Sequence, residues 1–315
     1  MKAGRPKRWI VGFVAIVVVV LVAVAVWPGE REPEYQGRKL SEWVRDMDYR
    51  NRAETAEALR AIGPEKAVLF FVKWMPYRAS RWRQRVSEFY WMHRKLPLER
   101  FALAQQQRNS VGFAKAQASV RGFVILGERA SNAIPALTHI AYGTDSPAAE
   151  RAVTSLSYLG KGAIDPLIKL GVDPALPPDR RSFVLRAMAH MTYLGTNAAP
   201  CLDVLAREAI TTNRETAAAA LTALSIFTYP TELPINVTDM AYLRNAMPDP
   251  LLRQLAMRAA IAIATNSDPF VYSFISQGTN DPDPGVRAEV VAYLDGRRRH
   301  FDGSKPYYDS TVKHE

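Results

Sequence analysis

Cysteine is almost absent from this sequence, since Cys201 stands alone among 315 residues, and an intrachain disulfide is therefore excluded. The five histidines are scattered, and no two lie three or four residues apart, as a metal-binding pair on one helix face requires. A Gly-x-Ser-x-Gly elbow, a glycine-rich phosphate loop and a His-Glu-x-x-His motif are missing as well. We therefore expect no metal site, no cofactor and no catalytic residue.

Acidic residues are in the minority. The 31 Asp and Glu stand against 41 Lys and Arg, which gives a net charge of +10 and an isoelectric point near 9.7. This balance permits binding to nucleic acid, to anionic lipid or to an acidic polymer. Because 48% of the residues are hydrophobic and 23% are charged, most of the chain is expected to fold.

Long apolar runs are missing except at residues 9–27, which are 19 residues without a charge. As a helix this segment would span roughly 28 Å, close to the thickness of a bilayer core. Basic residues 1–8 precede it and an acidic stretch follows it, which predicts a cytoplasmic N-terminus. We expect a retained single-pass anchor in the cell membrane, with the rest of the chain periplasmic or extracellular. The alternative is secretion after cleavage of a signal peptide, because Ala-Val-Ala at 23–25 resembles a processing site.

From residue 50 onward, a helical pattern with recurring Leu-Gly pairs indicates a repeat. The glycines Gly127, Gly160 and Gly195 lie 33 and 35 residues apart, and the next equivalent position, Thr228, lacks the glycine. Glycine just past a helix tolerates the left-handed conformation of a C-cap, and a proline shortly afterwards suits the start of a second helix. This period predicts an α-solenoid of roughly six or seven helix pairs.

A second signature, Asp-Pro-x-x-Arg, opens the expected first helices. The aspartate suits an N-cap, the proline suits the first helical position, and the arginine falls on the first turn. The copies are Asp249, Pro250 and Arg253, then Asp283, Pro284 and Arg287, and a looser one with Asp145, Pro147 and Arg151.

The segment 280–294 carries the Asp-Pro-x-x-Arg signature and 125–137 carries the Leu-Gly turn followed by Ile-Pro-Ala-Leu. Both resemble HEAT repeats, and the resemblance covers about residues 50–296. It implies an all-α fold, an α-solenoid of HEAT-like helix pairs that follows the N-terminal transmembrane helix. The whole layout is also similar to membrane-anchored HEAT-repeat proteins of Verrucomicrobia-type bacteria. That second resemblance implies no assigned activity.

The chain is expected to divide into five parts. They are a basic segment 1–8, the anchor 9–27, a linker and N-terminal cap 28–49, the repeat domain 50–296 with an insertion 77–118, and a tail 297–315. In the cap, Ser41 is the expected N-cap of a short helix, and Trp43 is expected to dock on the first repeat, which would otherwise expose an apolar face. A ligand-binding role for Trp43 is the alternative.

The insertion 77–118 breaks the period. Between Arg78 and Arg108 it holds eight Lys and Arg against two Glu, with Trp82, Phe89, Tyr90 and Trp91 interleaved. Cations with aromatics suit stacking on bases or sugars, or binding an anionic surface. The alternative, which we favour, is an elongated or additional helix whose aromatic side chains pack on the solenoid. The candidate binding residues are Arg81, Trp82, Arg83, Arg85, Trp91 and Arg94.

Two smaller features have competing interpretations. Cys201 lies near the start of a second helix, where the helix dipole would lower its pKa, but a small buried residue is the favoured interpretation. Of the paired acids Asp281 and Asp283, we expect the second to cap a helix and the first to be a solvated loop residue.

The main functional prediction is a membrane-tethered protein-interaction scaffold without catalysis, whose extended surface binds a protein partner or an acidic polymer. The first alternative is an enzyme, since some HEAT-like proteins are similar to lyases or to DNA glycosylases, which use a basic groove with aromatics and a carboxylate. The outward orientation argues against nucleic acid as a partner. The second alternative is binding of nucleic acid or an anionic polymer through the insertion.

Overall fold

The computed structural model describes residues 31–47, 50–78, 85, 88, 99–226, 249–263 and 275–301. These residues are mostly helical, apart from one small hairpin of β1 (Glu34–Tyr35) and β2 (Arg38–Lys39). The α-helices are α2 (Leu40–Arg45), α3 (Arg52–Ile62), α4 (Pro64–Trp74), α6 (Glu99–Leu126), α7 (Ile134–Tyr142), α8 (Ser146–Leu156), α9 (Ile164–Val172), α10 (Pro178–Met188), α11 (Ala199–Ala209), α12 (Arg214–Ile226), α14 (Pro250–Ile263) and α16 (Pro284–Phe301). The all-α prediction is confirmed.

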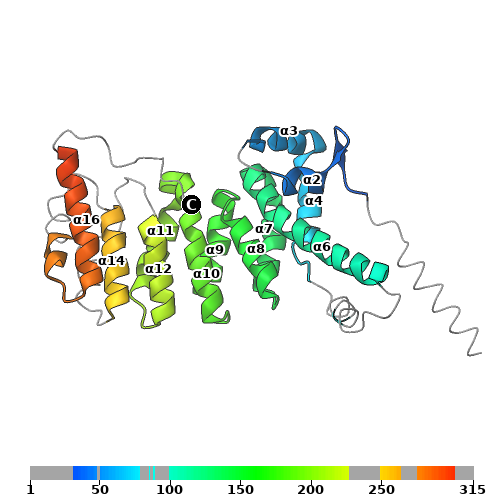
Figure 1. Ribbon diagram of the computed structural model, residues 1–315. Coiled ribbons are helices and arrows are strands. Elements are labelled where there is room, and N and C mark those ends of the chain that lie inside the picture. Colours follow the sequence, from blue (N-terminus) through cyan, green and yellow to red (C-terminus); the bar gives the residue numbers. More distant parts are fainter. Residues whose placement is uncertain are drawn as a thin grey trace, which may run out of the picture.

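Successive helix pairs stack side by side into an elongated α-solenoid of HEAT-like form (Figure 1). The first helices form one layer, in which α8 packs on α10, α10 on α12, α12 on α14 and α14 on α16. The second helices α7, α9 and α11 form the other layer, each in contact with the next. Alanine and leucine fill the space between the layers, and the small alanines let neighbouring helices approach closely.

The turn glycines act as the repeat pattern predicts, with one difference. Gly63, Gly127, Gly160 and Gly195 all have positive φ angles, of 97°, 54°, 81° and 57°. Their ψ angles are 122° at Gly63, −163° at Gly160 and −132° at Gly195, so these three lie outside the left-handed helical region that was expected. They occupy a region that is essentially restricted to glycine. The chain therefore turns sharply there instead of closing a standard C-cap.

The Asp-Pro-x-x-Arg signature begins helices as expected. The side chain of Asp249 accepts a hydrogen bond from the Leu251 N–H at 2.9 Å, and that of Asp283 accepts one from the Gly285 N–H at 2.9 Å. Each following proline is the first residue of its helix, α14 or α16. Asp145 makes no such side-chain bond, so the looser copy lacks the cap.

Asp281 is not the solvated loop residue that the sequence suggested. Its side chain is buried at 5% exposure and accepts a hydrogen bond from the Asp283 N–H at 2.9 Å. An ion pair with Arg253, at 3.4 Å from Nε to Oδ2, supplies the opposite charge that a buried carboxylate requires. The arginine of one repeat signature thus holds the loop that precedes the next.

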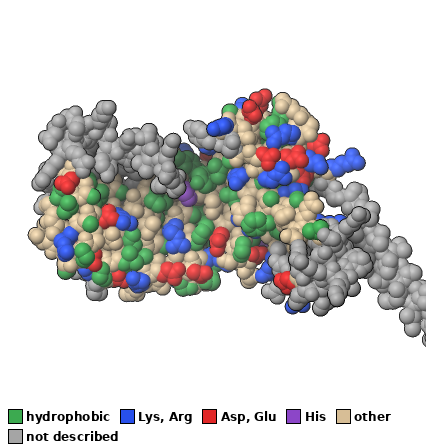
Figure 2. Space-filling view, in the orientation of Figure 1, with side chains coloured by type: hydrophobic (Ala, Val, Ile, Leu, Met, Phe, Trp, Pro, Cys, Tyr) green, Lys and Arg blue, Asp and Glu red, His purple; other side chains and the backbone are tan. Residues whose placement is uncertain are grey.

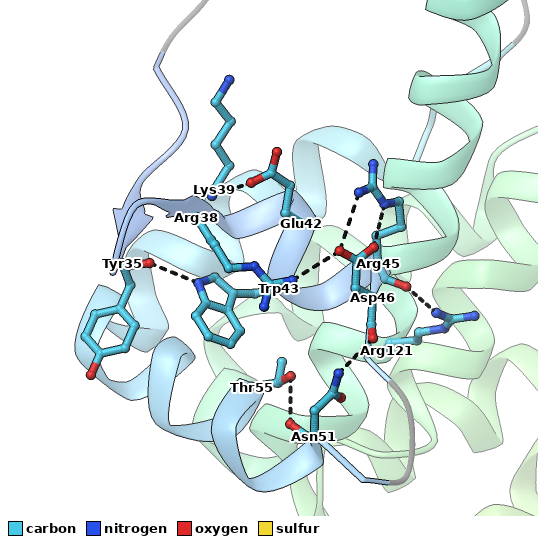
Figure 3. Close-up of polar contacts among 10 residues, drawn as sticks. All are labelled: Tyr35, Arg38, Lys39, Glu42, Trp43, Arg45, Asp46, Asn51, Thr55 and Arg121. Carbon is cyan, nitrogen blue, oxygen red and sulfur yellow. Dashed lines mark hydrogen bonds and ion pairs between the residues drawn. The ribbon is translucent and has the colours of Figure 1, made fainter.

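The N-terminal cap covers the first repeat with a hairpin and a short helix (Figure 3). Trp43 is 6% exposed, its indole N–H donates to the Tyr35 carbonyl at 3.2 Å, and Arg38 lies over its ring at 4.3 Å from the centroid. These contacts agree with the capping interpretation of Trp43.

The expected N-cap of this short helix is wrong. α2 begins at Leu40, so Ser41 lies inside the helix and does not cap it. The Glu42 carboxylate accepts the Lys39 N–H at 3.0 Å, and Glu32 accepts the Ser41 N–H at 3.2 Å. The carboxylates of Glu32 and Glu42, and not the hydroxyl of Ser41, therefore accept the free backbone N–H groups at the start of α2.

The structure bears on the predicted limits of the anchor, of the repeat domain and of the insertion. Residues 9–27 lie outside the described residues, and no helix within the described part of the chain is long and apolar enough to cross a membrane. α16 continues to Phe301, past the end expected at residue 296, because the arginines at 297–299 favour a helix. The segment 99–118 of the insertion belongs to α6, an elongated helix of 28 residues, whereas the aromatic residues at 82 and 89–91, expected to pack on the solenoid, lie outside the described residues.

Candidate binding surface at the base of the insertion

Helix α6 leaves the stack of helices in its N-terminal half (Figure 1). Its C-terminal half packs on α4 and α8 and buries Phe123 completely. Large apolar side chains are exposed farther from that end, with Phe113 near the middle of the helix at 55% and Leu103 in its N-terminal half at 47% exposure. Phe113 and Leu103 therefore form part of an accessible surface within the insertion.

Arg151 fixes the point at which the chain enters the insertion. This arginine of α8 is 6% exposed, and its guanidinium donates to the Met75 carbonyl from Nε at 3.1 Å and from a terminal nitrogen at 2.8 Å. A third bond reaches the Tyr77 carbonyl at 3.2 Å. Burial lowers the pKa of Arg151, while the charges of Asp145 and Glu150 act in the opposite direction. The guanidinium thus satisfies carbonyls at the open end of α4.

Tyr77 connects the entry of the insertion to α6. Its hydroxyl donates to the side-chain oxygen of Asn109 at 3.0 Å. Its ring lies so close to the backbone at Gly112 that a Cβ there would fall within 3.0 Å of three ring carbons. The two ends of the insertion are therefore joined by one aromatic residue packed against a glycine.

Two exposed cations flank this joint, and a third lies elsewhere in the insertion. Arg78 follows Tyr77, Arg108 precedes Asn109 on α6, and Arg85 is the third; all are exposed. None of the three forms an ion pair with any residue that the structure describes.

Of the predicted binding residues, only Arg85 is described. Arg81, Trp82, Arg83, Trp91 and Arg94 lie outside the described residues. The structure adds Arg78, Arg108 and the buried Arg151 to the surroundings of the insertion. Arg151 was visible in the sequence as part of the looser repeat signature, but no local signal indicated that its partners lie 76 residues earlier.

Charges of both signs are intermixed over the repeats. On the face that Figure 2 shows, Lys and Arg alternate with Asp and Glu over the stacked helices and the N-terminal cap. Several of these charges form ion pairs, such as Arg258 with Glu289 and Arg214 with Asp249. Within the described residues, the exposed arginines Arg78, Arg85 and Arg108 form no such pair.

The linker that precedes the cap is attached to α6 through a charged contact. Lys115 donates to Glu32, and its ammonium group lies 5.5 Å from the centre of the Trp74 ring. Burial raises the pKa of Glu32, but hydrogen bonds from Lys115 and Ser41 outweigh burial, and the net shift is downward. A lowered pKa means that this contact stabilises the fold above the ordinary pKa of the carboxyl and is lost as the pH falls through the lowered value.

The structure decides between the two interpretations of Cys201. Cys201 is fully buried, and burial followed by the charge of Asp165 raises the pKa of its thiol to about 12. The favoured interpretation of a buried packing residue is thereby confirmed, and activation by the helix dipole is wrong. No group of three or more His, Cys, Asp or Glu within the described ranges is arranged to hold a metal ion.

Comparison with known protein families and with curated proteins gave no match. Among solved structures, the chain is similar to human deoxyhypusine hydroxylase in complex with glycerol, at 14% sequence identity. The alignment covers 81% of this chain and 93% of the hydroxylase, with a TM-score of 0.33. This similarity concerns the helical-repeat form and transfers no residue role, cofactor or reaction to this chain.

The comparison corrects the main functional prediction. The similar solved structure is that of an enzyme and does not agree with the predicted non-catalytic protein-interaction scaffold, which is not carried further. The alternatives to that prediction, an enzyme or a binder of an anionic polymer, are the interpretations that stand. No comparison connects the chain to a bacterial group.

Proposed function

We propose that this protein binds an anionic polymer through the surface at the base of the insertion. One observation carries the proposal: Arg78, Arg85 and Arg108 are exposed at three points around the insertion, without an ion pair among the described residues. A polymer with regularly spaced anionic groups contacts several such cations at once. Its affinity then exceeds that of a single anion, because later contacts are intramolecular.

Two further features support this assignment. Without the four cations of residues 1–8, 37 Lys and Arg stand against 31 Asp and Glu, and this net charge of +6 attracts polyanions over a distance of about a Debye length, roughly 8 Å at physiological ionic strength. The entry to the insertion is held by the three hydrogen bonds of Arg151 and by the Tyr77–Asn109 bond. A surface held in place loses less conformational entropy when it binds.

Charge reversal tests the proposal. The full chain is titrated with fluorescein-labelled poly-L-glutamate at low ionic strength, and compared with a variant that combines Arg78→Glu, Arg85→Glu and Arg108→Glu. We expect the variant to bind at least about tenfold more weakly, because each reversed exposed charge contributes roughly 0.5 to 1 kcal/mol.

A matched control carries the same change of charge elsewhere. Arg52, Arg186 and Arg207 are exposed arginines of α3, α10 and α11, away from the insertion. Their combined reversal to glutamate lowers the net charge equally and is expected to weaken binding much less. Equal weakening in both variants, or failure of the unaltered chain to bind, would contradict the proposal.

We also propose that residues 9–27 anchor the chain in the cell membrane and that the solenoid faces the periplasm or the exterior. The uncharged run, its terminal tryptophans and the basic residues before it support this orientation. Similarity in layout to membrane-anchored HEAT-repeat proteins of Verrucomicrobia-type bacteria agrees with it. A reporter fused to the C-terminus is expected to be active outside the cytoplasm, and activity restricted to the cytoplasm would contradict the orientation.

A further inference from the structure

The chain that leads back toward the proposed anchor is attached to the side of α6. Glu32 accepts a hydrogen bond from the Ser41 N–H at 3.2 Å and another from the ammonium group of Lys115 on α6. Only 12% of the Glu32 side chain is exposed, and the Lys115 ammonium group also lies over the ring of Trp74. The linker therefore leaves the solenoid from a fixed point on α6.

The distance from this point to the proposed anchor is limited by the length of the chain. Trp27 is the last residue of the uncharged run, and Glu32 follows it by five positions. An extended chain covers at most about 3.6 Å per residue, so Glu32 lies within about 18 Å of Trp27. Tryptophan at the end of a membrane helix lies at the level of the lipid headgroups. With residues 9–27 in a membrane, the Lys115 side of α6 is thus held next to the lipid surface.

The side of α6 that carries Lys115 has the composition that suits an anionic surface. Arg108, Val111 and Lys115 are three and four positions apart, so they lie on the same side of the helix, over about 10 Å of its length. Arg108 is exposed, and Val111 is 42% exposed. The sequence contains no Asp or Glu between residues 100 and 127, so α6 beyond its first residue carries basic charge alone.

The linker adds a second exposed cation beside this side of α6. Arg31 precedes Glu32 directly, and neither Arg31 nor Arg108 forms an ion pair within the part of the chain that the structure describes. Anionic lipids attract cations that are held close to the membrane, and the attraction falls off within a Debye length. The short linker keeps both arginines in the region where this attraction acts.

We propose that Arg31 and the side of α6 that carries Arg108 and Val111 lie against an anionic lipid surface beside the anchor. This contact rests on the proposed anchor at residues 9–27, and it adds which side of the solenoid faces the lipid. The Glu32–Lys115 contact sets the distance. Once the anchor is inserted the contact is intramolecular, so two cations and one valine are sufficient to form it. Val111 has no part in the proposed polymer binding and therefore reports on the lipid alone.

Quenching by spin-labelled lipids tests the contact. Val111→Cys is labelled with the fluorophore NBD, and the full chain is inserted into vesicles of phosphatidylcholine with about 30% phosphatidylglycerol. Cys201 does not compete for the label, because burial raises the pKa of its thiol to about 12. Spin-labelled lipids are expected to lower the fluorescence at least about twofold. Added Arg108→Glu is expected to weaken the quenching, whereas Arg207→Glu, at an exposed arginine of α11, leaves it unchanged.

Val291→Cys is the matched control, because Val291 is a 47% exposed valine of α16, at the opposite end of the solenoid (Figure 1). Its label is expected to stay unquenched. Flotation of the vesicles shows separately whether the chain is anchored. In a chain that floats, absence of quenching at position 111, equal quenching at both positions, or equal quenching in pure phosphatidylcholine overturns the lipid contact and leaves the anchor in place. A chain that does not float overturns the anchor and the contact together.

Discussion

Replacing Gly122 with alanine is expected to destabilise the chain by about 2 kcal/mol, although alanine is the better helix former. Gly122 lies in α6, directly beneath the ring of Phe71 from α4. An added Cβ would fall within 3.0 Å of three carbons of that ring. Phe71 is fully buried and packs edge-on against Phe123 at 5.6 Å between centroids, so it has no free space to enter. The clash with Phe71 is expected to destabilise the fold by about 3 kcal/mol, which exceeds the gain of about 1 kcal/mol from the higher helix propensity of alanine.

Gly296 provides the matched control for this substitution. It is also a helical glycine, in α16, but a Cβ there meets no atom within 4 Å. Gly296→Ala is expected to be neutral or to stabilise the chain by up to about 1 kcal/mol. Thermal unfolding of both variants measures the difference, and the melting temperature of Gly122→Ala should fall by roughly 5 °C. Effects of equal sign and size would show that the Phe71 contact is wrongly placed.

Replacing Arg151 with methionine is expected to lower the free energy of unfolding by about 2 to 3 kcal/mol. Methionine retains most of the aliphatic stem but cannot donate to the carbonyls of Met75 and Tyr77, which lose three hydrogen bonds. Release from the cost of burying a guanidinium offsets part of this loss. Urea unfolding measures the free energy, and hydrogen exchange should report the loss of protection at the entry of the insertion.

Arg121→Met is the comparison for Arg151→Met. Arg121 is exposed and donates a single bond, to the Arg45 carbonyl at 2.8 Å (Figure 3). Its replacement is expected to cost less than about 1 kcal/mol, as for most surface substitutions. If both variants lose the same free energy of unfolding, the hydrogen bonds of Arg151 do not hold the entry of the insertion.

The repeat architecture could be predicted because its signals are local. A glycine with positive φ, a proline in the first turn of a helix and an aspartate cap each depend on the backbone within a few residues. Gly160, Asp249 and Asp283 therefore act where the sequence places them. The departure of Gly160 from the left-handed helical region was not predictable, because its ψ depends on how the next turn packs against it.

The surroundings of the candidate site depend on distant contacts, which periodicity does not encode. Arg151 was recognised as a repeat residue, but its partners come from a turn 76 positions earlier. Asp281 was expected in solvent, because its partner Arg253 lies in the preceding first helix, 28 positions earlier. The stacked rings of Tyr158 and Tyr193 likewise required two turns to be brought together. Motifs alone predicted the stacking units, whereas side-chain partners between units emerged only in the structure.

The central claim is that the part of the chain that interrupts the repeat is the part that binds an anionic polymer. Photo-crosslinking of the full chain with diazirine-labelled poly-L-glutamate, followed by peptide mapping, tests it most directly. The account predicts that crosslinks concentrate in residues 77–118 and are lost when unlabelled polymer competes. Crosslinks spread evenly over the helices from α8 to α12, or absent from residues 77–118, would contradict it.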